Sequence, residues 1–268
     1  MKDLSLYERM DLTGNGFPAK ILTLNKCKSI LPHWHEHLEL HLFLKGRGEV
    51  FCDGNKICVE KGDLTISNSS QIHSVYSERG VGFHALIVSP DLFSDIDFKD
   101  IVIQNHIKND EFIIDCFTRM VNEYDNYKIG SDMVIKSLVY SLFAHLVRNY
   151  STRSPEIAET HRAHLKRLDK VFNYISEFYN EDITSKTLAE MTYLTESYFC
   201  RFFKSITGLT VANYLSQYRV EKACYLLKKT DASISEISEN VGFTDQNYFA
   251  RVFKKIMGTS PTEYRKGL

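Results

Sequence analysis

The chain has 268 residues, enough for two domains of ordinary size, and its 43% hydrophobic and 12% aromatic content can fill two cores. The net charge is −1, so the chain is not strongly basic, and its total charge does not indicate a nucleic-acid partner. There is no apolar leader and no apolar run of membrane-spanning length, and the six Cys lack metal-ligand spacing. We therefore expect a cytoplasmic protein with reduced thiols and no membrane partner.

Residues 20–90 consist of short alternating runs, the pattern of β-strands. The runs are separated by glycines, at Gly46, Gly48, Gly54, Gly62, Gly80 and Gly82. From Leu38 to Leu44 every second residue is Leu, whereas Glu39, His41 and Phe43 have the opposite parity. The odd-numbered His33, His35 and His37 share that parity. One face of this β segment is therefore rich in imidazole and carboxylate and is predicted to line a pocket.

The spacing of these residues resembles a known family. His33-x-His35-x3-Glu39-x6-Gly46 resembles the first cupin motif, and Gly62-Asp63 followed by His73 resembles the second, with Asn68 where cupins usually have Pro. The resemblance implies a β-barrel and four metal ligands, His33, His35, Glu39 and His73. Three imidazoles and one carboxylate suit Zn, Ni, Mn or Fe(II).

Two uses of this face remain open. It could hold a divalent transition metal, or it could bind an organic effector directly without any required cofactor. In the second case the hydrogen-bonding groups would be His33, His35, Glu39, His41 and His73. We favour the organic effector, because the missing Pro leaves the placement of His73 open.

Two helices are expected after the strands, at about 109–126 and 131–150. The second has a broad apolar stripe, formed by Ile135, Leu138, Val139, Leu142, Phe143 and Leu146. This stripe can cover the barrel or contact a second copy, and it motivates the prediction of a homodimer. Residues 153–163 are polar and without periodicity, and they are expected to form a linker.

The second half of the chain contains a repeat. YFCRFFKSITG at 198–208 returns as YFARVFKKIMG at 248–258, and each copy has one apolar stripe and one Arg/Lys face. Ser233 and Glu236 form a capping box for a short helix before the second copy, Gly242 permits a turn, and Thr244 is the expected next cap. A short helix, a turn and a helix with an exposed polar face form a helix-turn-helix.

The outward faces of the two copies are predicted to contact duplex DNA. In the first copy these residues are Ser197, Cys200, Arg201 and Lys204. In the second they are Gln246, Asn247, Ala250, Arg251, Lys254 and Lys255. Between the copies, residues 211–229 form one amphipathic helix that could hold the two reading helices about one turn of DNA apart.

Residues 164–268 resemble the DNA-binding domain of AraC/XylS-type transcription regulators, down to the terminal Gly258-Thr-Ser-Pro261-Thr-Glu-Tyr264 segment. The resemblance implies a monomeric domain whose third and sixth helices enter successive major grooves. Residues 161–268 carry 16 Lys and Arg against 12 Asp and Glu, so the placement of charge, and not its sum, indicates DNA.

The sequence thus predicts an α+β protein. A cupin-like β-barrel with two helices at 1–152 is followed by a linker at 153–163 and an all-α domain at 164–268, with two helix-turn-helix units joined by a long helix. The expected function is a non-enzymatic, effector-responsive transcriptional regulator, more often an activator, acting on promoter DNA with RNA polymerase. A sugar or related metabolite is the expected effector. The alternatives are a metal-dependent cupin enzyme fused to a DNA-binding domain and a constitutive DNA binder.

Overall fold

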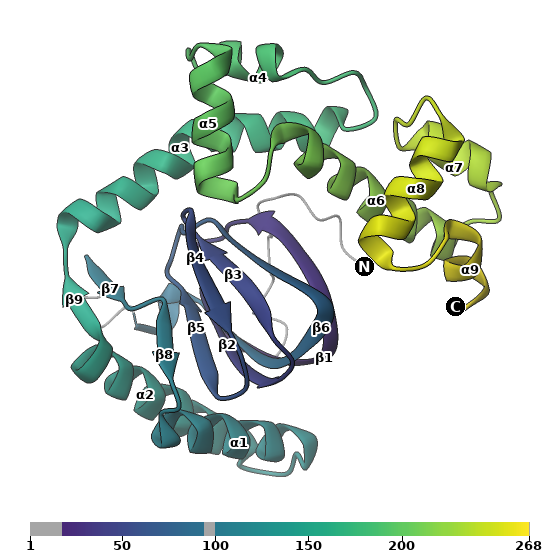
Figure 1. Cartoon of the computed structure of the whole chain (residues 1–268). Coiled ribbons are helices and arrows are strands. Elements are labelled where there is room, and N and C mark those ends of the chain that lie inside the picture. Colours follow the sequence, from purple (N-terminus) through teal and green to yellow (C-terminus); the bar gives the residue numbers. More distant parts are fainter. Residues whose placement is uncertain (1–17, 94–99, 268) are drawn as a thin grey trace. The chain divides into compact units, whose positions relative to one another are not determined.

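The computed structural model describes residues 18–93 and 100–267, with the backbone alone at residue 161 (Figure 1). The chain divides into two compact units between residues 165 and 166. Among the described residues no helix is both long and apolar enough to cross a lipid bilayer.

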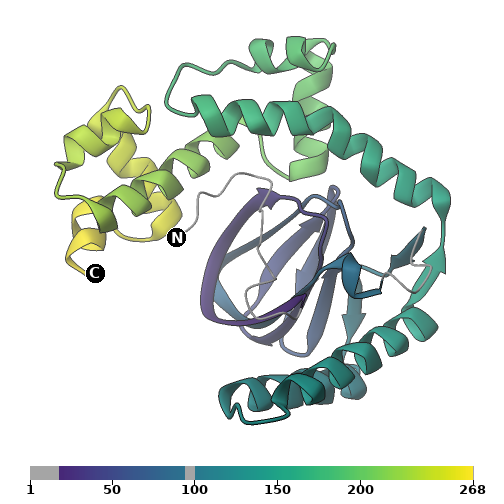
Figure 2. The same ribbon diagram turned by 180° about the vertical axis from the view of Figure 1, so that it is seen from behind.

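The first unit is built on an antiparallel sheet that curves into a barrel (Figures 1 and 2). Its strands are β1 (Ala19–His33), β2 (Leu38–Lys45), β3 (Gly48–Cys52), β4 (Asn55–Val59), β5 (Asp63–Ser67), β6 (His73–Val88) and β8 (His106–Lys108). Their order is β4-β3-β6-β2-β5-β8, and β1 also pairs with the long strand β6. The predicted barrel is therefore confirmed, and the turn between β3 and β4 lies at Asp53 and Gly54, both at positive φ.

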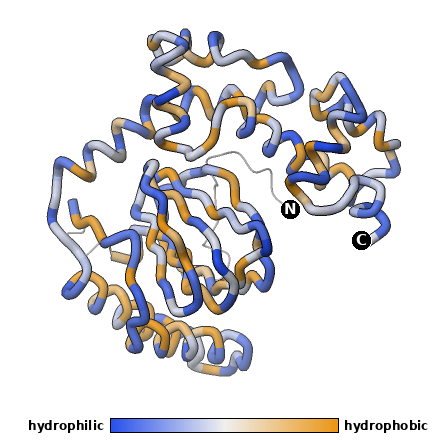
Figure 3. The backbone as a smooth tube through the Cα atoms, in the orientation of Figure 1, coloured by the Kyte–Doolittle hydropathy of each residue, from blue (hydrophilic) through white to orange (hydrophobic). Residues whose placement is uncertain are grey.

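The two faces of β2 differ as its alternation predicts. Leu38, Leu40 and Leu42 belong to a core shared with α1 (Glu111–Asp125) and α2 (Ser131–Tyr150). Phe43 belongs to a second core inside the barrel, together with Phe83. Figure 3 shows the hydrophobic segments along these strands and helices, and Figure 2 shows both helices on one side of the barrel.

The apolar stripe of α2 is covered within the unit. Leu142 is 0% exposed and lies in the same core as Leu40 and Leu86 of the sheet. The stripe is therefore not free to contact a second copy, and the reason given for a homodimer was wrong. Core burial and dimer burial produce the same sequence pattern, so the stripe could not distinguish them.

The segment expected to be a linker has regular structure instead. The strand β9 (Ser151–Arg153) pairs with β7 (Ile101–Ile103), and the helix α3 (Pro155–Phe178) begins two residues later. Ser154 Oγ accepts a hydrogen bond from Ile157 N at 3.4 Å, and Pro155 occupies the first helical position. The first turns of α3 are mostly exposed, so they need no apolar stripe and show no periodicity.

The second unit contains two helix-turn-helix units, as predicted. They are α4 (Ser185–Met191) with α5 (Glu196–Thr207), and α7 (Ile234–Asn240) with α8 (Gln246–Met257), joined by α6 (Val211–Lys229) and followed by α9 (Pro261–Lys266). Gly208 and Gly258 end α5 and α8 in the left-handed conformation. The capping boxes at Ser233 and Ser260 are both present.

The cap of α8 and the turns that precede α8 and α5 show how backbone conformation selects residues in the second unit. Asp245 caps α8 by accepting from the backbone N–H groups of Asn247 and Tyr248, so the expected cap at Thr244 was wrong by one residue. The turn between α7 and α8 needs Gly242, because its φ is +87° and an added Cβ would lie 2.6 Å from Asn180 O. The matching turn before α5 has Tyr193 at φ 56°.

Candidate DNA interface and barrel site

The helices α5 and α8 expose the same positions of the repeat, and both bury its two central phenylalanine positions. Phe199 and Phe203 in α5, and Phe249 and Phe253 in α8, are 0% exposed. The predicted DNA contacts lie on the opposite faces. The exposed ones are Ser197, Arg201, Lys204, Gln246, Asn247, Arg251, Lys254 and Lys255, and the half-buried ones are Cys200 and Ala250. Two equivalent polar faces with cationic side chains are therefore available to a partner.

Sequence reasoning missed three aromatic side chains at this surface. Tyr193 lies in the loop between α4 and α5 and is 92% exposed. Tyr198 and Tyr248 lie near the starts of α5 and α8 and are about half exposed. A phenolic hydroxyl at these positions can donate to a phosphate oxygen. The recurrence of Tyr198 as Tyr248 was the available signal, since an exposed aromatic residue that repeats is not explained by the core.

The helix α6 joins the two helix-turn-helix units to each other. Its 19 residues correspond to about 28 Å. Tyr214 and Tyr218 are buried along it, and Arg219 donates from Nε to Tyr179 O at 2.6 Å and from Nη2 to Glu181 O at 2.7 Å. Buried rings and charged hydrogen bonds to backbone carbonyls fix this helix against the end of α3.

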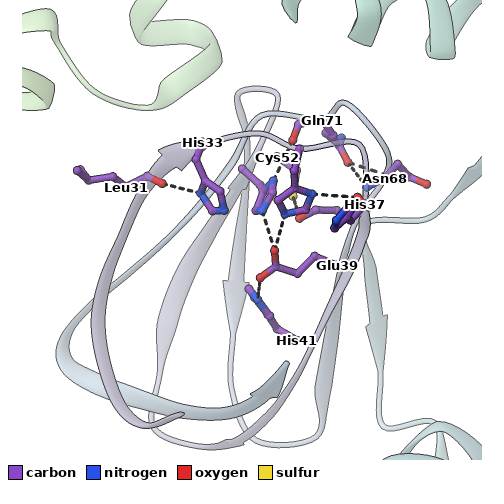
Figure 4. Close-up of polar contacts among 11 residues, drawn as sticks. Leu31, His33, His37, Glu39, His41, Cys52, Asn68 and Gln71 are labelled. Carbon is purple, nitrogen blue, oxygen red and sulfur yellow. Dashed lines mark hydrogen bonds and ion pairs between the residues drawn. The ribbon is translucent and has the colours of Figure 1, made fainter. Parts of the chain in front are cut away.

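The structure brings together the four predicted metal ligands. Figure 4 shows two of them, His33 and Glu39, toward one end of the barrel. His33 ends β1, His35 lies in the following loop, Glu39 is near the start of β2, and His73 begins β6. Residues 33 and 73 are paired across β1 and β6. All four side chains are buried, and one potential ligand atom from each lies within 4.8 Å of the others.

Glu39 is the centre of this cluster. Its Oε2 lies 2.7 Å from His35 Nε2 and 3.3 Å from His73 Nε2. Its Oε1 lies 2.5 Å from Nε2 of His41, which Figure 4 shows deeper in the barrel. Burial alone would raise the pKa of Glu39, but the charge of His41 and the hydrogen bond from its ring hold that pKa well below its ordinary value. The carboxylate is therefore ionised.

The other nitrogen of each histidine is anchored on the backbone. Nδ1 lies 2.9 Å from Leu31 O in His33, 3.1 Å from His37 O in His35, and 2.9 Å from Gln71 O in His73. A carbonyl oxygen only accepts, so each Nδ1 carries the proton and donates. In a neutral ring the Nε2 lone pair then faces the cluster, as in histidines that bind metals.

Charge and protonation make this arrangement suitable for a cation. Burial lowers the pKa of His33 to about 3 and also lowers the pKa of His73, so both rings are neutral at pH 7. A neutral His73 that donates from Nδ1 cannot also donate from Nε2 to Glu39. The contact between His73 Nε2 and Glu39 Oε2 is then one between two acceptors, which a cation between them would satisfy. The donor set therefore fits a divalent transition metal.

The close packing of the rings limits what the cluster can hold as it stands. The ring centroids of His33 and His73 are 4.2 Å apart, and those of His41 and Phe83 are 4.4 Å apart. The space among the four ligand atoms suits a single ion and is too small for a sugar. A sugar would have to displace these rings or bind beside them.

Asn68, the departure from the second cupin motif, has a structural role of its own. Its side chain accepts from Ile103 N at 2.9 Å and donates to Ile103 O at 2.8 Å. Three residues later Gln71 provides the carbonyl that anchors His73. The absence of Pro therefore does not displace His73.

Comparison with known proteins agrees with both halves of the structure. Residues 28–143 match the family described as AraC-like ligand binding domain, and residues 188–267 match a helix-turn-helix domain. A transcriptional regulator of Bacillus subtilis named YdeC is 26% identical over 87% of this chain and 85% of its own length. The transcriptional activator RhaR of Enterobacter is 26% identical over 87% of this chain and 86% of its own. The chain belongs to the AraC family of transcriptional regulators.

A likeness of fold extends over most of the chain. A crystal structure of an apo ToxT variant from Vibrio cholerae covers 94% of this chain and 98% of its own, with a TM-score of 0.52 and 13% identity, a likeness of fold alone. Between the two matched regions lie the end of α2, β9 and α3. This AraC-family protein thus pairs a ligand-binding barrel with a helix-turn-helix domain, a combination that is normally not enzymatic.

Proposed function

We propose that this AraC-family regulator is an activator that binds promoter DNA through α5 and α8 and changes its DNA binding when the barrel takes up a small-molecule effector. The relative from Enterobacter is named a transcriptional activator, which supports the sign of regulation. RNA polymerase as a partner, a homodimer and a cytoplasmic location belong to the same proposal. An effector can shift the protein only by binding its two states with different affinity.

The observation that carries the DNA-binding proposal is the equivalence of the two exposed faces. Arg201 and Arg251 occupy the same position of the repeat and are both exposed. Arg is the side chain that most often reads guanine, by a bidentate contact in the major groove. With α6 of about 28 Å between them, two reading helices can reach major grooves about 34 Å apart on one face of DNA.

The experiment begins with selection of a binding sequence from random duplexes by the full chain. Fluorescence anisotropy then compares the wild type with Arg201→Ala and Arg251→Ala. Each change is expected to weaken specific binding by about 1–3 kcal/mol if the contact is bidentate. Arg119→Ala is the matched control, because Arg119 is an exposed arginine of α1 that pairs with Asp115. Unchanged affinity in both test variants would remove these arginines from the interface.

In the barrel, His33, His35, Glu39 and His73 would hold a divalent transition metal. When bound, such an ion supplies a Lewis-acidic centre at which oxygen atoms of a sugar or related metabolite can be recognised. His41 orients Glu39, and the carbonyls of Leu31, His37 and Gln71 hold the three rings with Nε2 inward. The donor chemistry of the cluster, with neutral nitrogens beside an ionised carboxylate, supports this choice over direct binding of an organic effector.

The enzyme alternative has one observation in its favour, the same three histidines and one carboxylate, which also occur in metal-dependent enzymes. Incubation of the full chain with metal, oxygen and a panel of sugars and hydroxy acids tests it. Turnover that is lost in Glu39→Gln would establish an enzyme. Binding without turnover supports a sensor.

A further inference from the structure

The loop between β5 and β6 contains a group of buried amide side chains that the sensing role does not yet explain. We call residues 68–72 the amide loop. Asn68 and Gln71 are both buried. Gln71 Oε1 accepts from Asn68 N at 3.0 Å and from Asn105 Nδ2 at 2.6 Å. Neutral amides bury poorly without partners, so a network this complete holds its backbone segments together.

One side of the amide loop contacts the metal-ligand cluster. Gln71 O accepts from His73 Nδ1 at 2.9 Å, and Ser70 N donates to His35 O at 3.0 Å. Two of the four ligands are therefore bonded directly to this loop. The loop is thus bonded to the ring of His73 and to the backbone of His35, so movement of either group acts on the loop.

The other side of the amide loop holds β7. The Asn68 side chain bonds to both the N–H and the carbonyl of Ile103, much as a neighbouring strand would. Asn105 Nδ2 also donates to Ile66 O, and Ile66 N donates to Asn105 O, which ties the end of β7 to β5. The segment 103–105 is thus fixed to the amide loop through side chain and backbone together.

The strand β7 in turn holds β9, which leads into α3. Residues 103 and 151 are paired, Gln104 N donates to Tyr150 O at 2.8 Å, and Ser154 N donates to Asp100 O at 2.9 Å. β9 is only three residues long, and α3 starts at Pro155 and continues past residue 166 as one helix. The order of contacts is therefore cluster, amide loop, β7, β9 and the helix that enters the DNA-binding unit.

We propose that the amide loop couples the metal-ligand cluster to the start of α3, with Asn68 as the positioning residue that joins the two. When His35 and His73 shift to bind a ligand, the loop shifts with them, and Asn68 carries that shift to β7 and β9. The inference deepens the proposed function and rests on the cluster being the effector site. The path of contacts predicts an energetic coupling between the cluster and β9.

The test is a double-mutant cycle read by amide hydrogen exchange of the full chain without added ligand. The variants are His73→Ala, Asn68→Ala and the double variant, and the readout is the peptide over residues 150–156. His73→Ala is expected to speed exchange there at least about fivefold when Asn68 is present and less than about twofold in the Asn68→Ala background. The same change in both backgrounds, or no change in either, overturns the proposal.

Two controls separate coupling from general loosening. His84→Ala removes a histidine of the same strand that bonds to Thr23 and not to the amide loop, so it is expected to leave the 150–156 peptide unchanged. Peptides from α1 report global unfolding in every variant. If Asn68→Ala does not fold, Asn105→Ala removes the Gln71 contact and leaves the Ile103 contacts intact, and a partial loss of coupling is then expected.

A final arm adds ZnCl₂ to the wild type and to Asn68→Ala. Zinc is expected to slow exchange of the 150–156 peptide in the wild type and to have no effect on that peptide in Asn68→Ala, although both chains bind it. An equal effect in both chains overturns the coupling. If neither chain binds zinc, the metal part of the proposed function fails, and the ligand-free cycle still decides on the coupling.

Discussion

Removal of one histidine from the barrel cluster gives the sharpest test of what the cluster binds. In His35→Ala the ring whose Nε2 lies 2.7 Å from Glu39 Oε2 is absent. Loss of an outer partner of a metal ligand typically weakens binding 10–100-fold, so loss of a ligand itself is expected to weaken it at least about 100-fold. Purified wild type is expected to carry about one equivalent of Zn, Ni, Mn or Fe, and His35→Ala to carry almost none.

The pH dependence gives a second, quantitative expectation. Only a neutral imidazole coordinates, so three histidines of ordinary pKa would make the logarithm of metal affinity fall by about three units per pH unit below pH 6. The buried His33, with its pKa lowered to about 3, is already neutral at pH 5 and contributes no competing proton there. The expected slope between pH 6 and 4.5 is therefore at most about two.

Elemental analysis and competition with a chromophoric chelator measure both quantities. His84→Ala is the control, since His84 is a half-buried histidine of β6 that bonds to Thr23, outside the cluster. A slope near three would contradict the protonation states assigned to the cluster. Full metal content in His35→Ala, or no uptake of any of the four ions by the wild type, would refute the metal site and leave direct binding of an organic effector.

Three further outcomes are expected from other parts of the structure. Lys254→Ala, on the exposed face of α8, should weaken binding to all DNA sequences equally and reduce the salt slope by about one unit in anisotropy titrations at several salt concentrations. Leu142→Glu should destabilise the first unit by at least about 3 kcal/mol, and not simply separate a dimer, because Leu142 is 0% exposed. Urea unfolding followed by the fluorescence of the single Trp measures this loss, and Met133→Glu is the control because Met133 is 76% exposed. Gly242→Ala should cost at least about 1 kcal/mol more than Gly130→Ala, measured by hydrogen exchange in each unit, because both have positive φ and only Gly242 has a backbone in the way of a Cβ.

Local signals made the second unit predictable. The caps at Thr195, Ser233 and Ser260, the glycines that end α5 and α8, and the repeated apolar stripe all act within a few residues of their own helix. The error at Thr244 has the same origin, since Asp245 beside it is an equally good cap and only the backbone conformation selects between them.

For the first unit, the sequence predicted which strand residues face the barrel interior, but not which distant residues contact one another. Parity placed Glu39 and His41 on the inner face of β2 and Leu40 on the outer one, as the two cores show. The partner of Asn68 could not be foreseen, because Ile103 is 35 residues away and no local pattern encodes that contact. The helical start of α3 was missed for the opposite reason, since an exposed helix leaves no apolar period to detect.

The difference between the two turns has a consequence for how this protein can evolve. Residue 242 is confined to Gly by its φ and by the nearby backbone of Asn180, so selection has almost no freedom there. Tyr193 occupies the matching turn with its side chain 92% exposed, so packing restricts that side chain little, and the positive φ of 56° favours Asn and Asp there over β-branched residues. Sequence change within the turn is therefore expected to be tolerated more readily in the first helix-turn-helix unit than in the second. A library randomised at residues 193 and 242 and sorted for folded protein should recover many residues at the first position and almost only Gly at the second.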